Sequence, residues 1–322
     1  MKKTSQPIAL RTVFMGTSVF ANEILEKLLA EKYTLVGVYT KPDKKIGREQ
    51  VVKPGIVKET AQKNSLPIFQ PKRFDKETVA ELSSLKPDLI IVASYGKILP
   101  KEVLEMPGFG CLNVHASLLP ELRGPSPIQN ALLQGKTETG ITIMLMDEGI
   151  DTGAILSQEK IAIEPEDSSG TLFPKLANLG ANLLAQTLPH WINRQIEPTE
   201  QDSQKATLCQ LIDREDGHVF WNHGAESIYN RYRALTPWPG IFSFWKADGD
   251  LLRVKLLEIS LQKKDPLSSH EIGEVFELAD KIAVQTMEGA IILETIQLEG
   301  KKPASAKDFV NGYKNFVGSI LS

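Results

Sequence analysis

Cysteine is scarce in this sequence, which has only Cys111 and Cys209 among its 322 residues. The two lie far apart and in no paired spacing, so neither a disulfide framework nor a zinc site built from thiolates is indicated. We expect both cysteines to be packed in the interior as free thiols.

Long hydrophobic runs are also absent. No apolar stretch approaches the roughly 18 residues that a membrane-spanning helix needs, and the 42% apolar and 24% charged fractions are typical of a globular protein. Near the N-terminus, Pro7, Arg11 and Thr12 interrupt any apolar centre of a secretory signal. The sequence therefore predicts a cytoplasmic protein without a membrane partner, and leaves an organellar origin open.

An overall excess of positive charge is missing too, because the net charge is −3. The net charge of the whole chain therefore does not favour binding to nucleic acid. The segment 41–58 is an exception, with six basic residues against two acidic ones. Residues 206–322 have 13 basic and 16 acidic residues, so any RNA contact there must depend on a local patch such as Arg231/Arg233, Arg253/Lys255, Lys263/Lys264 or Lys301/Lys302.

The length predicts two domains, because 322 residues exceed what one hydrophobic core usually organises. In the first half, short apolar runs alternate with helical periodicity, which predicts a doubly wound, mostly parallel α/β sheet. Its expected strands are 11–16, 34–40, 88–94, 110–116 and 138–147, and its expected helices are 18–32 and 168–193.

The last third predicts a small β-barrel, because short β-like runs are separated by turn residues. The expected strands are 240–247, 251–261, 273–278, 282–287 and 290–298, after a helix at about 223–235. Ser305 and Asp308 have capping-box-like spacing before a last helix. We therefore place a catalytic domain at 1–196, a polar linker at 197–210 and the barrel at 211–322.

The turn after the first strand contains Gly16, but the Gly-x-Gly-x-x-Gly fingerprint of dinucleotide sites is missing. Nucleotide binding stays open as an alternative. In the simpler interpretation, Gly16 permits a tight turn, and Thr17 or Ser18 caps the following helix.

Ligands of open parallel sheets bind at the carboxyl ends of strands, so the loops after Gly16, Ser94, His115 and Asp147 are candidate walls of one crevice. Asn113 and His115 are two positions apart on a strand, so their side chains share one face while Val114 points to the other.

An amide N–H next to an imidazole suits attack on a carbonyl, because one can stabilise a developing oxyanion and the other can relay a proton. Asp147 or Asp151 could orient the imidazole. A purely structural Asn-x-His pair, or a metal bound by His115 and Asp151, remain alternatives. Ser117 lies in Ser-Leu-Leu-Pro and not in a nucleophile elbow, which favours direct transfer over an acyl-enzyme.

The segment CLNVHASLLPELRGPSPIQNALLQGKTETGITIMLMDEGIDTG resembles the core signature of the 10-formyltetrahydrofolate-dependent formyltransferases. The resemblance implies that 10-formyltetrahydrofolate is the co-substrate, that no metal is needed, and that Asn113, His115 and Asp151 form a catalytic trio. It also implies that the residues matching the family's folate segment lie against tetrahydrofolate: Ser117, Leu118, Leu119 and Pro120.

The rest of the chain resembles the members of that family that formylate methionyl initiator tRNA. RYRALTPWPGIFSFW and the β-rich region after it resemble their C-terminal domain, which implies an OB-like fold, and the basic segment 41–58 resembles their tRNA-binding insertion. The resemblance implies that Arg48 binds tRNA, although Glu49 and Gln50 occupy positions where members of that family commonly have further Gly and Lys.

Three alternatives stay open from sequence. The segment containing Arg48 could be an ordinary solvated loop, the acceptor could be a small amine such as an amino sugar nucleotide, and the chain could be a folate- or RNA-binding regulator without turnover. We expect a monomer.

Overall fold

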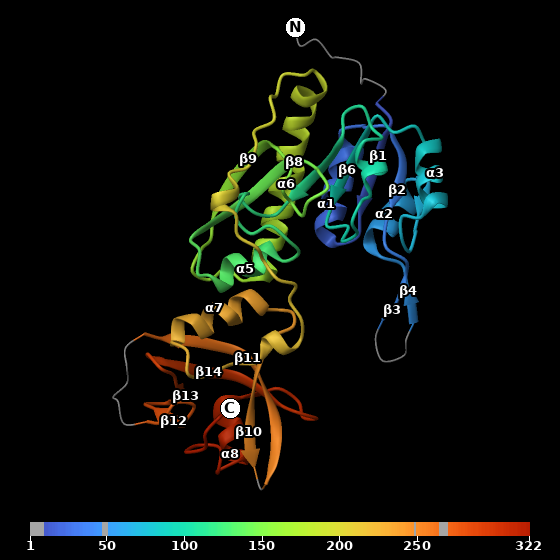
Figure 1. Cartoon of the computed structure of the whole chain (residues 1–322). Helices are drawn as coiled ribbons and strands as arrows, with labels where there is room; N and C mark the ends of the chain where they lie inside the picture. Colours follow the sequence, from blue (N-terminus) through green and yellow to red (C-terminus); the bar gives the residue numbers. More distant parts are fainter. Residues whose placement is uncertain (1–9, 47–50, 248, 264–269) are drawn as a thin grey trace. The chain divides into compact units, whose positions relative to one another are not determined.

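The computed structural model describes residues 10–46, 51–247, 249–263 and 270–322. The chain divides into two compact units (Figure 1). The first contains residues 1–127, 138–162 and 173–210, and the second contains residues 128–137, 163–172 and 211–322.

A seven-stranded sheet forms the centre of the first unit, in the order β5-β2-β1-β6-β7-β8-β9. The strands from β5 to β7 are parallel, and β8 and β9 each run antiparallel to the strand before them. Their bounds are β1 (Thr12–Gly16), β2 (Leu35–Tyr39), β5 (Ile68–Phe69), β6 (Leu89–Ala93), β7 (Cys111–His115), β8 (Glu138–Leu145) and β9 (Ile155–Ala162).

Helices connect the parallel strands, as expected for βαβ units: α1 (Val19–Ala30), α2 (Ile56–Lys63), α3 (Lys76–Ser84) and α4 (Lys101–Leu104). The short α5 (Pro127–Leu133) stands between β7 and β8 in the chain, and most of it belongs to the second unit; the long α6 (Ser169–Ile192) follows β9. Between β2 and α2, the short antiparallel strands β3 (Lys44–Ile46) and β4 (Val51–Lys53) form a hairpin that extends away from the main sheet (Figure 1).

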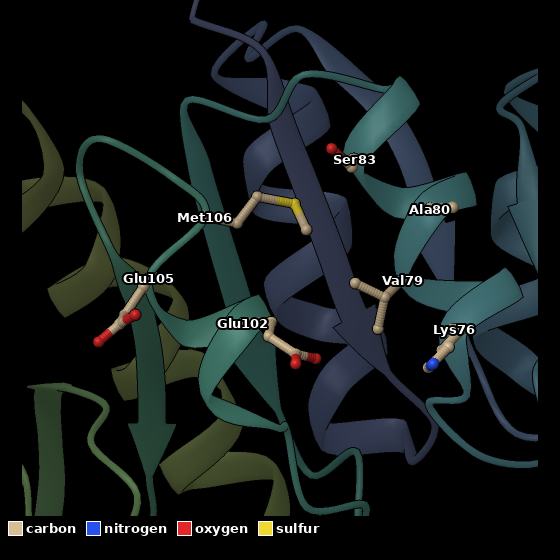
Figure 2. Close-up of a pocket in the computed structure, with 7 residues that line it drawn as sticks. All are labelled: Lys76, Val79, Ala80, Ser83, Glu102, Glu105 and Met106. Atoms are coloured by element: carbon tan, nitrogen blue, oxygen red, sulfur yellow. The ribbon is translucent and has the colours of Figure 1, made fainter.

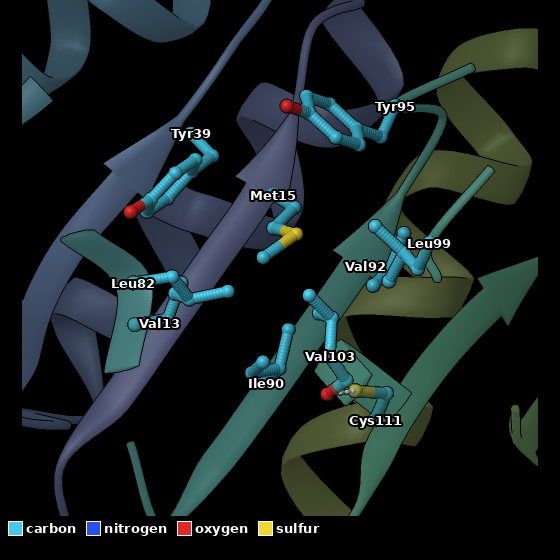
Figure 3. Packing of buried hydrophobic residues seen from close by; sticks show 10 residues of the cluster. All are labelled: Val13, Met15, Tyr39, Leu82, Ile90, Val92, Tyr95, Leu99, Val103 and Cys111. Atoms are coloured by element: carbon cyan, nitrogen blue, oxygen red, sulfur yellow. Dashed lines mark hydrogen bonds between the residues drawn. The ribbon is translucent and has the colours of Figure 1, made fainter. Parts of the chain in front are cut away.

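The two faces of β7 have different surroundings. Gly180 of α6 lies against Val114, because a Cβ added at Gly180 would be only 3.0 Å from the Val114 Cγ1 atom. On the other face, Cys111 joins a buried cluster together with Leu82 of α3 and Val103 of α4 (Figure 3). Since side chains alternate along a strand, Asn113 and His115 share the face of Cys111, farther toward its carboxyl end.

An antiparallel sheet in the order β10-β11-β14-β13-β12 forms the core of the second unit, with β15 paired to β14. The elements of this unit are α7 (Ala225–Leu235), β10 (Ile241–Ala247), β11 (Asp250–Gln262), β12 (Val275–Leu278), β13 (Lys281–Gln285), β14 (Ala290–Leu298), β15 (Ala304–Ser305) and α8 (Ala306–Gly312). A 3₁₀ turn at Glu215–Gly217 precedes α7, and another 3₁₀ turn, Ser203–Lys205, belongs to the first unit.

The last residues bridge both edges of this sheet. The Ser319 carbonyl accepts from the Val275 N–H of β12 at 2.9 Å, and Ser322 exchanges backbone hydrogen bonds with Phe244 of β10 at 2.8 and 2.9 Å. Inside, the ring of Trp245 packs edge-on against Phe316, with centroids 5.2 Å apart. The edges are therefore paired, which removes the exposed strand edge that an open sheet would leave.

The predicted fold class is confirmed: a mostly parallel α/β sheet precedes a small antiparallel β-domain. The Ser305 cap is also confirmed, because its Oγ accepts from the Asp308 N–H at 3.1 Å. The expected route of one loop is wrong. β8 runs antiparallel to β7, so the loop after Asp147 leaves the sheet at the end of the strands opposite to the loop after His115.

Leu82 tests the packing of the first unit, because its side chain is fully buried against the sheet (Figure 3). Leu82→Ala removes buried methyl groups and leaves a cavity, so the free energy of unfolding should fall by about 2–5 kcal/mol. Denaturant unfolding measures this change. The neighbouring Ser83→Ala, at an exposed position, is the control; equal midpoints for both variants would contradict this packing.

Candidate active site

The Asp151 carboxylate is the point where three segments of the first unit meet. Its Oδ1 accepts from the Asn113 Nδ2 at 3.2 Å, and its Oδ2 accepts from the Gly124 N–H at 2.8 Å. The His115 Nδ1 lies 3.5 Å from the same Oδ2. The structure thus brings together Asn113, His115 and Asp151, from β7 and from the loop between β8 and β9.

The imidazole of His115 is held on both sides. It is only 6% exposed, and its Nε2 lies 2.9 Å from the Leu122 carbonyl oxygen while its Nδ1 faces Asp151. A carbonyl oxygen only accepts, so Nε2 carries the hydrogen in this contact. A neutral ring would then accept at Nδ1, whereas the imidazolium form has an N–H for each of the two oxygens.

Of the two aspartates considered from sequence, only Asp151 contacts His115 in the structure. Asp147 instead stabilises its own loop, because its Oδ1 accepts from the Gly149 N–H at 3.0 Å and from the Thr152 hydroxyl at 2.6 Å. The contacts of Asp151 show that the loop after β8 folds back toward β7, so that a loop starting at the opposite end of the strands reaches Asn113.

The Ser-Leu-Leu-Pro segment is anchored by residues that the sequence did not reveal. The Thr142 hydroxyl of β8 donates to the Ser117 carbonyl at 2.7 Å and accepts from the Leu119 N–H at 3.1 Å. The Gln158 amide of β9 donates to the Leu119 carbonyl and to the Thr142 hydroxyl, both at 2.8 Å. Thr142 and Gln158 lie on the antiparallel strands β8 and β9, and the sequence pattern does not determine the register of these strands.

The four residues expected against tetrahydrofolate differ in burial. Ser117 and Leu119 are buried, with exposed fractions of 1% and 3%, whereas Leu118 and Pro120 are partly exposed. The Ser117 hydroxyl is also occupied, because it donates to the Glu121 carbonyl at 2.6 Å. A ligand on this segment therefore meets mainly its backbone and the side chains of Leu118 and Pro120.

Arg48 lies outside the residues that the structure describes, between the hairpin strands β3 and β4. In the second unit, several of the suggested basic patches have internal partners. Arg233 is buried and donates to the Asp167 carbonyl at 3.2 Å, Arg231 donates to the Asp216 carbonyl, and the guanidinium of Arg253 stacks 3.7 Å from the Phe242 ring centroid. These three arginines therefore contribute to packing.

Two simpler interpretations from sequence agree with the geometry. The Ser18 hydroxyl caps α1 by accepting from the Ala21 N–H, and a Cβ added at Gly16 would come within 2.6 Å of the Ala21 Cβ. Cys111 and Cys209 are both buried as free thiols, and burial raises the pKa of Cys111 to about 12. The prediction of packed thiols is confirmed.

A separate pocket of the first unit lies between α3 and α4 (Figure 2). None of the predicted site residues is part of its lining, which consists of Lys76, Val79, Ala80, Ser83, Glu102, Glu105 and Met106.

Within the described ranges, no helix is long and apolar enough to cross a membrane. Across the same ranges, no group of three or more His, Cys, Asp or Glu side chains is arranged to hold a metal ion.

Comparison of the sequence with known families gives two matches. Residues 10–188 match the formyl transferase family, and residues 211–314 match the formyl transferase C-terminal domain. The methionyl-tRNA formyltransferase of Caldicellulosiruptor saccharolyticus is 49% identical over 314 residues, which cover 96% of this chain and 99% of that protein. The methionyl-tRNA formyltransferase of Bacillus cytotoxicus is 39% identical over 316 residues, covering 97% and 98%.

Among solved structures, the fold is similar to that of an N-formyltransferase from Helicobacter canadensis, in complex with folinic acid and dTDP-3-aminofucose. The TM-score is 0.65 at 19% sequence identity, and the match covers 88% of this chain and 98% of the other. At this identity the likeness concerns the fold.

Thr142 tests how the Ser-Leu-Leu-Pro segment is held. Thr142→Val keeps the shape of the side chain but leaves the Ser117 carbonyl and the Leu119 N–H without their buried partner, so the free energy of unfolding should fall by about 1–3 kcal/mol. Thr142→Ser keeps the hydroxyl and should be the more stable variant. Urea unfolding measures both, and a Val variant as stable as the wild type would contradict the assigned role.

Proposed function

The chain belongs to the methionyl-tRNA formyltransferase family, and from that premise we propose how its residues carry out the reaction. The protein is a formyltransferase that acts on methionyl-tRNA. The donor is a formyl-folate, which we propose to be 10-formyltetrahydrofolate, and the acceptor is proposed to be the α-amino group of methionine on initiator tRNA. The product would be N-formylmethionyl-tRNA, which is used to start translation.

The observation that carries the proposed mechanism is the convergence of Asn113 and His115 on the Asp151 carboxylate. In our proposal the unprotonated methionine amine attacks the formyl carbon, and the formyl oxygen becomes the oxyanion of a tetrahedral intermediate. The Asn113 amide has two N–H groups, so one can stay on Asp151 while the other donates to the oxyanion.

His115 would contribute a second donor in its imidazolium form. Its Nε2 must then exchange the Leu122 carbonyl for the formyl oxygen, and Asp151 would hold the Nδ1 side of the ring during this exchange. Asp151 would also assist removal of the proton from the attacking amine after the C–N bond has formed. The intermediate then collapses, the bond from the formyl carbon to the N10 atom of the folate breaks, and N10 takes up the proton as tetrahydrofolate leaves.

The partly exposed Leu118 and Pro120, together with the anchored backbone of residues 117–120, are proposed to lie against tetrahydrofolate. Arg48 is proposed to contact the acceptor end of the tRNA, because a planar, permanently charged guanidinium suits phosphates and exposed base edges. The domain boundaries at 196 and 211, a monomeric state and a cytoplasmic location stay predictions.

The proposed acceptor is tested by supplying 10-formyltetrahydrofolate with either methionyl initiator tRNA or an amino sugar nucleotide, with methionyl elongator tRNA as a control. Formyl-methionine released after ester hydrolysis, with preference for the initiator, is the expected result. Formylation of the amino sugar nucleotide alone would contradict the proposal.

Asn113→Ala and His115→Ala should each lower kcat by roughly 10²-fold or more, the usual cost of losing an oxyanion donor or a positioned acid. The exposed Asn193→Ala and His190→Ala are matched controls and should keep wild-type turnover. Steady-state formylation assays measure kcat for all four variants. A near-normal kcat for Asn113→Ala or His115→Ala would contradict the proposed role of that residue.

Arg48→Ala should lower kcat/KM for methionyl-tRNA by roughly tenfold, because one charged contact to the RNA is lost. The affinity for tetrahydrofolate should stay unchanged. Arg73→Ala is the control, since the Arg73 side chain is 83% exposed in the same unit and outside the basic insertion. Equal losses in both arginine variants, or a parallel loss of folate affinity for Arg48→Ala, would argue against a specific tRNA contact.

A further inference from the structure

We propose that Gln201 and Arg123 are positioning residues for Asp151, an assignment that rests on the proposed function of that carboxylate. Gln201 comes from the segment 197–210, which the sequence pattern predicts to be a linker. In the structure this segment belongs to the first unit and contacts the loop that carries Asp151.

The side-chain amide of Gln201 holds the backbone of that loop directly. Its Nε2 donates to the Asp151 carbonyl at 2.9 Å and to the Gly153 carbonyl at 2.7 Å. One amide group therefore spans the residue that supplies the carboxylate and a residue two positions later.

Arg123 fixes which way this amide points. Its guanidinium donates from Nε at 3.0 Å and from one terminal nitrogen at 2.8 Å to the Gln201 Oε1. Arginine has only donors and a backbone carbonyl only accepts, so the oxygen of Gln201 must face Arg123 and its NH₂ must face the loop. Arg123 is only 7% exposed, so the guanidinium is shielded from competing water.

The loop needs such support because its backbone is restricted at two points. Asp151 has a φ of +51°, in the left-handed region that non-glycine residues rarely adopt. At Gly153, an added Cβ would lie 1.8 Å from the Leu145 carbonyl oxygen, so the loop passes directly over the end of β8. A conformation of this kind persists only where surrounding contacts hold it.

The segment that carries Gln201 is itself fixed to the site. Thr199 exchanges backbone hydrogen bonds with Ile155 at 2.8 and 2.9 Å, and the Cys209 N–H donates to the Arg123 carbonyl at 2.8 Å. Arg123 also precedes Gly124, whose N–H donates to the Asp151 carboxylate. The same turn thus holds Asp151 twice, at its carboxylate through Gly124 and at its backbone through Arg123 and Gln201.

Loss of Gln201 should therefore displace the carboxylate without removing any group that contacts a substrate. Displacements of about 1 Å in a catalytic group are enough to slow a reaction strongly. Gln201→Met keeps the length of the side chain and removes its polar atoms, so kcat should fall by roughly tenfold or more while the KM for the formyl donor changes by less than about twofold.

Two further variants test whether the hydrogen bonds of the Gln201 amide are responsible for the effect. Gln201→Glu keeps an oxygen for Arg123 but places its other oxygen against two carbonyl oxygens, so it should also lose turnover although its side chain has nearly the same shape. Gln204→Met is the matched control, because the same substitution is made at an exposed position three residues later. It should keep wild-type kcat.

A double-mutant cycle decides whether Gln201 acts through Asp151. We would measure kcat for Gln201→Met, Asp151→Ala and the double variant, with thermal unfolding to verify that each is folded. If Gln201 acts by positioning Asp151, its substitution should cost less than about twofold once Asp151 is alanine. An equal loss in both backgrounds, or wild-type kcat in Gln201→Met, would overturn the proposal.

The cycle also separates this inference from the function on which it rests. If Asp151→Ala retains wild-type kcat, the proposed role of Asp151 is wrong. If Asp151→Ala loses turnover and Gln201→Met does not, the role of Asp151 stands and only the positioning role fails. Should Gln201→Met not fold, Gln201→Asn replaces it in the same cycle, because it keeps the amide but is too short to bridge Arg123 and the loop.

Discussion

The structure of the site depends on one carboxylate that is contacted from three sides. The Asp151 carboxylate accepts from the Asn113 amide and from the Gly124 N–H, and the His115 Nδ1 lies 3.5 Å from its Oδ2. A buried or half-buried carboxylate is stable only when such donors replace water. The strand β7, the turn at 122–124 and the loop between β8 and β9 are therefore fixed relative to one another by the electrostatic requirement of a single side chain.

The sheet gives this carboxylate a rigid surrounding. Because β8 and β9 run antiparallel at the edge of an otherwise parallel sheet, their loop can fold back over β7, and their side chains Thr142 and Gln158 can hold the backbone of residues 117–120. In the proposed reaction, the donor would lie against this anchored segment, next to the Asn113 amide. Positioning by fixed dipoles in a largely dry site is the usual origin of rate enhancement in acyl transfer.

Much of this architecture follows from sequence pattern, and the reasons for the exceptions are physical. Apolar runs such as residues 89–93 identify strands that are covered on both faces, and the spacing of Asn113 and His115 predicts their common face. Strand direction is not encoded in alternation, so the antiparallel course of β8 was missed. Whether Asp147 or Asp151 faces His115 depends on how a glycine-containing loop turns, which residue spacing does not decide. Gln201 lies in a polar segment without periodicity, so only its hydrogen bonds identify it.

The position of the Asp151 carboxylate, and not merely its charge, organises the site. Single-turnover formyl transfer by Asp151→Glu tests this directly, because glutamate keeps the charge but moves it by one methylene. The expected rate is roughly tenfold or more below that of the wild type, with tetrahydrofolate affinity unchanged. A single-turnover rate equal to that of the wild type would contradict it.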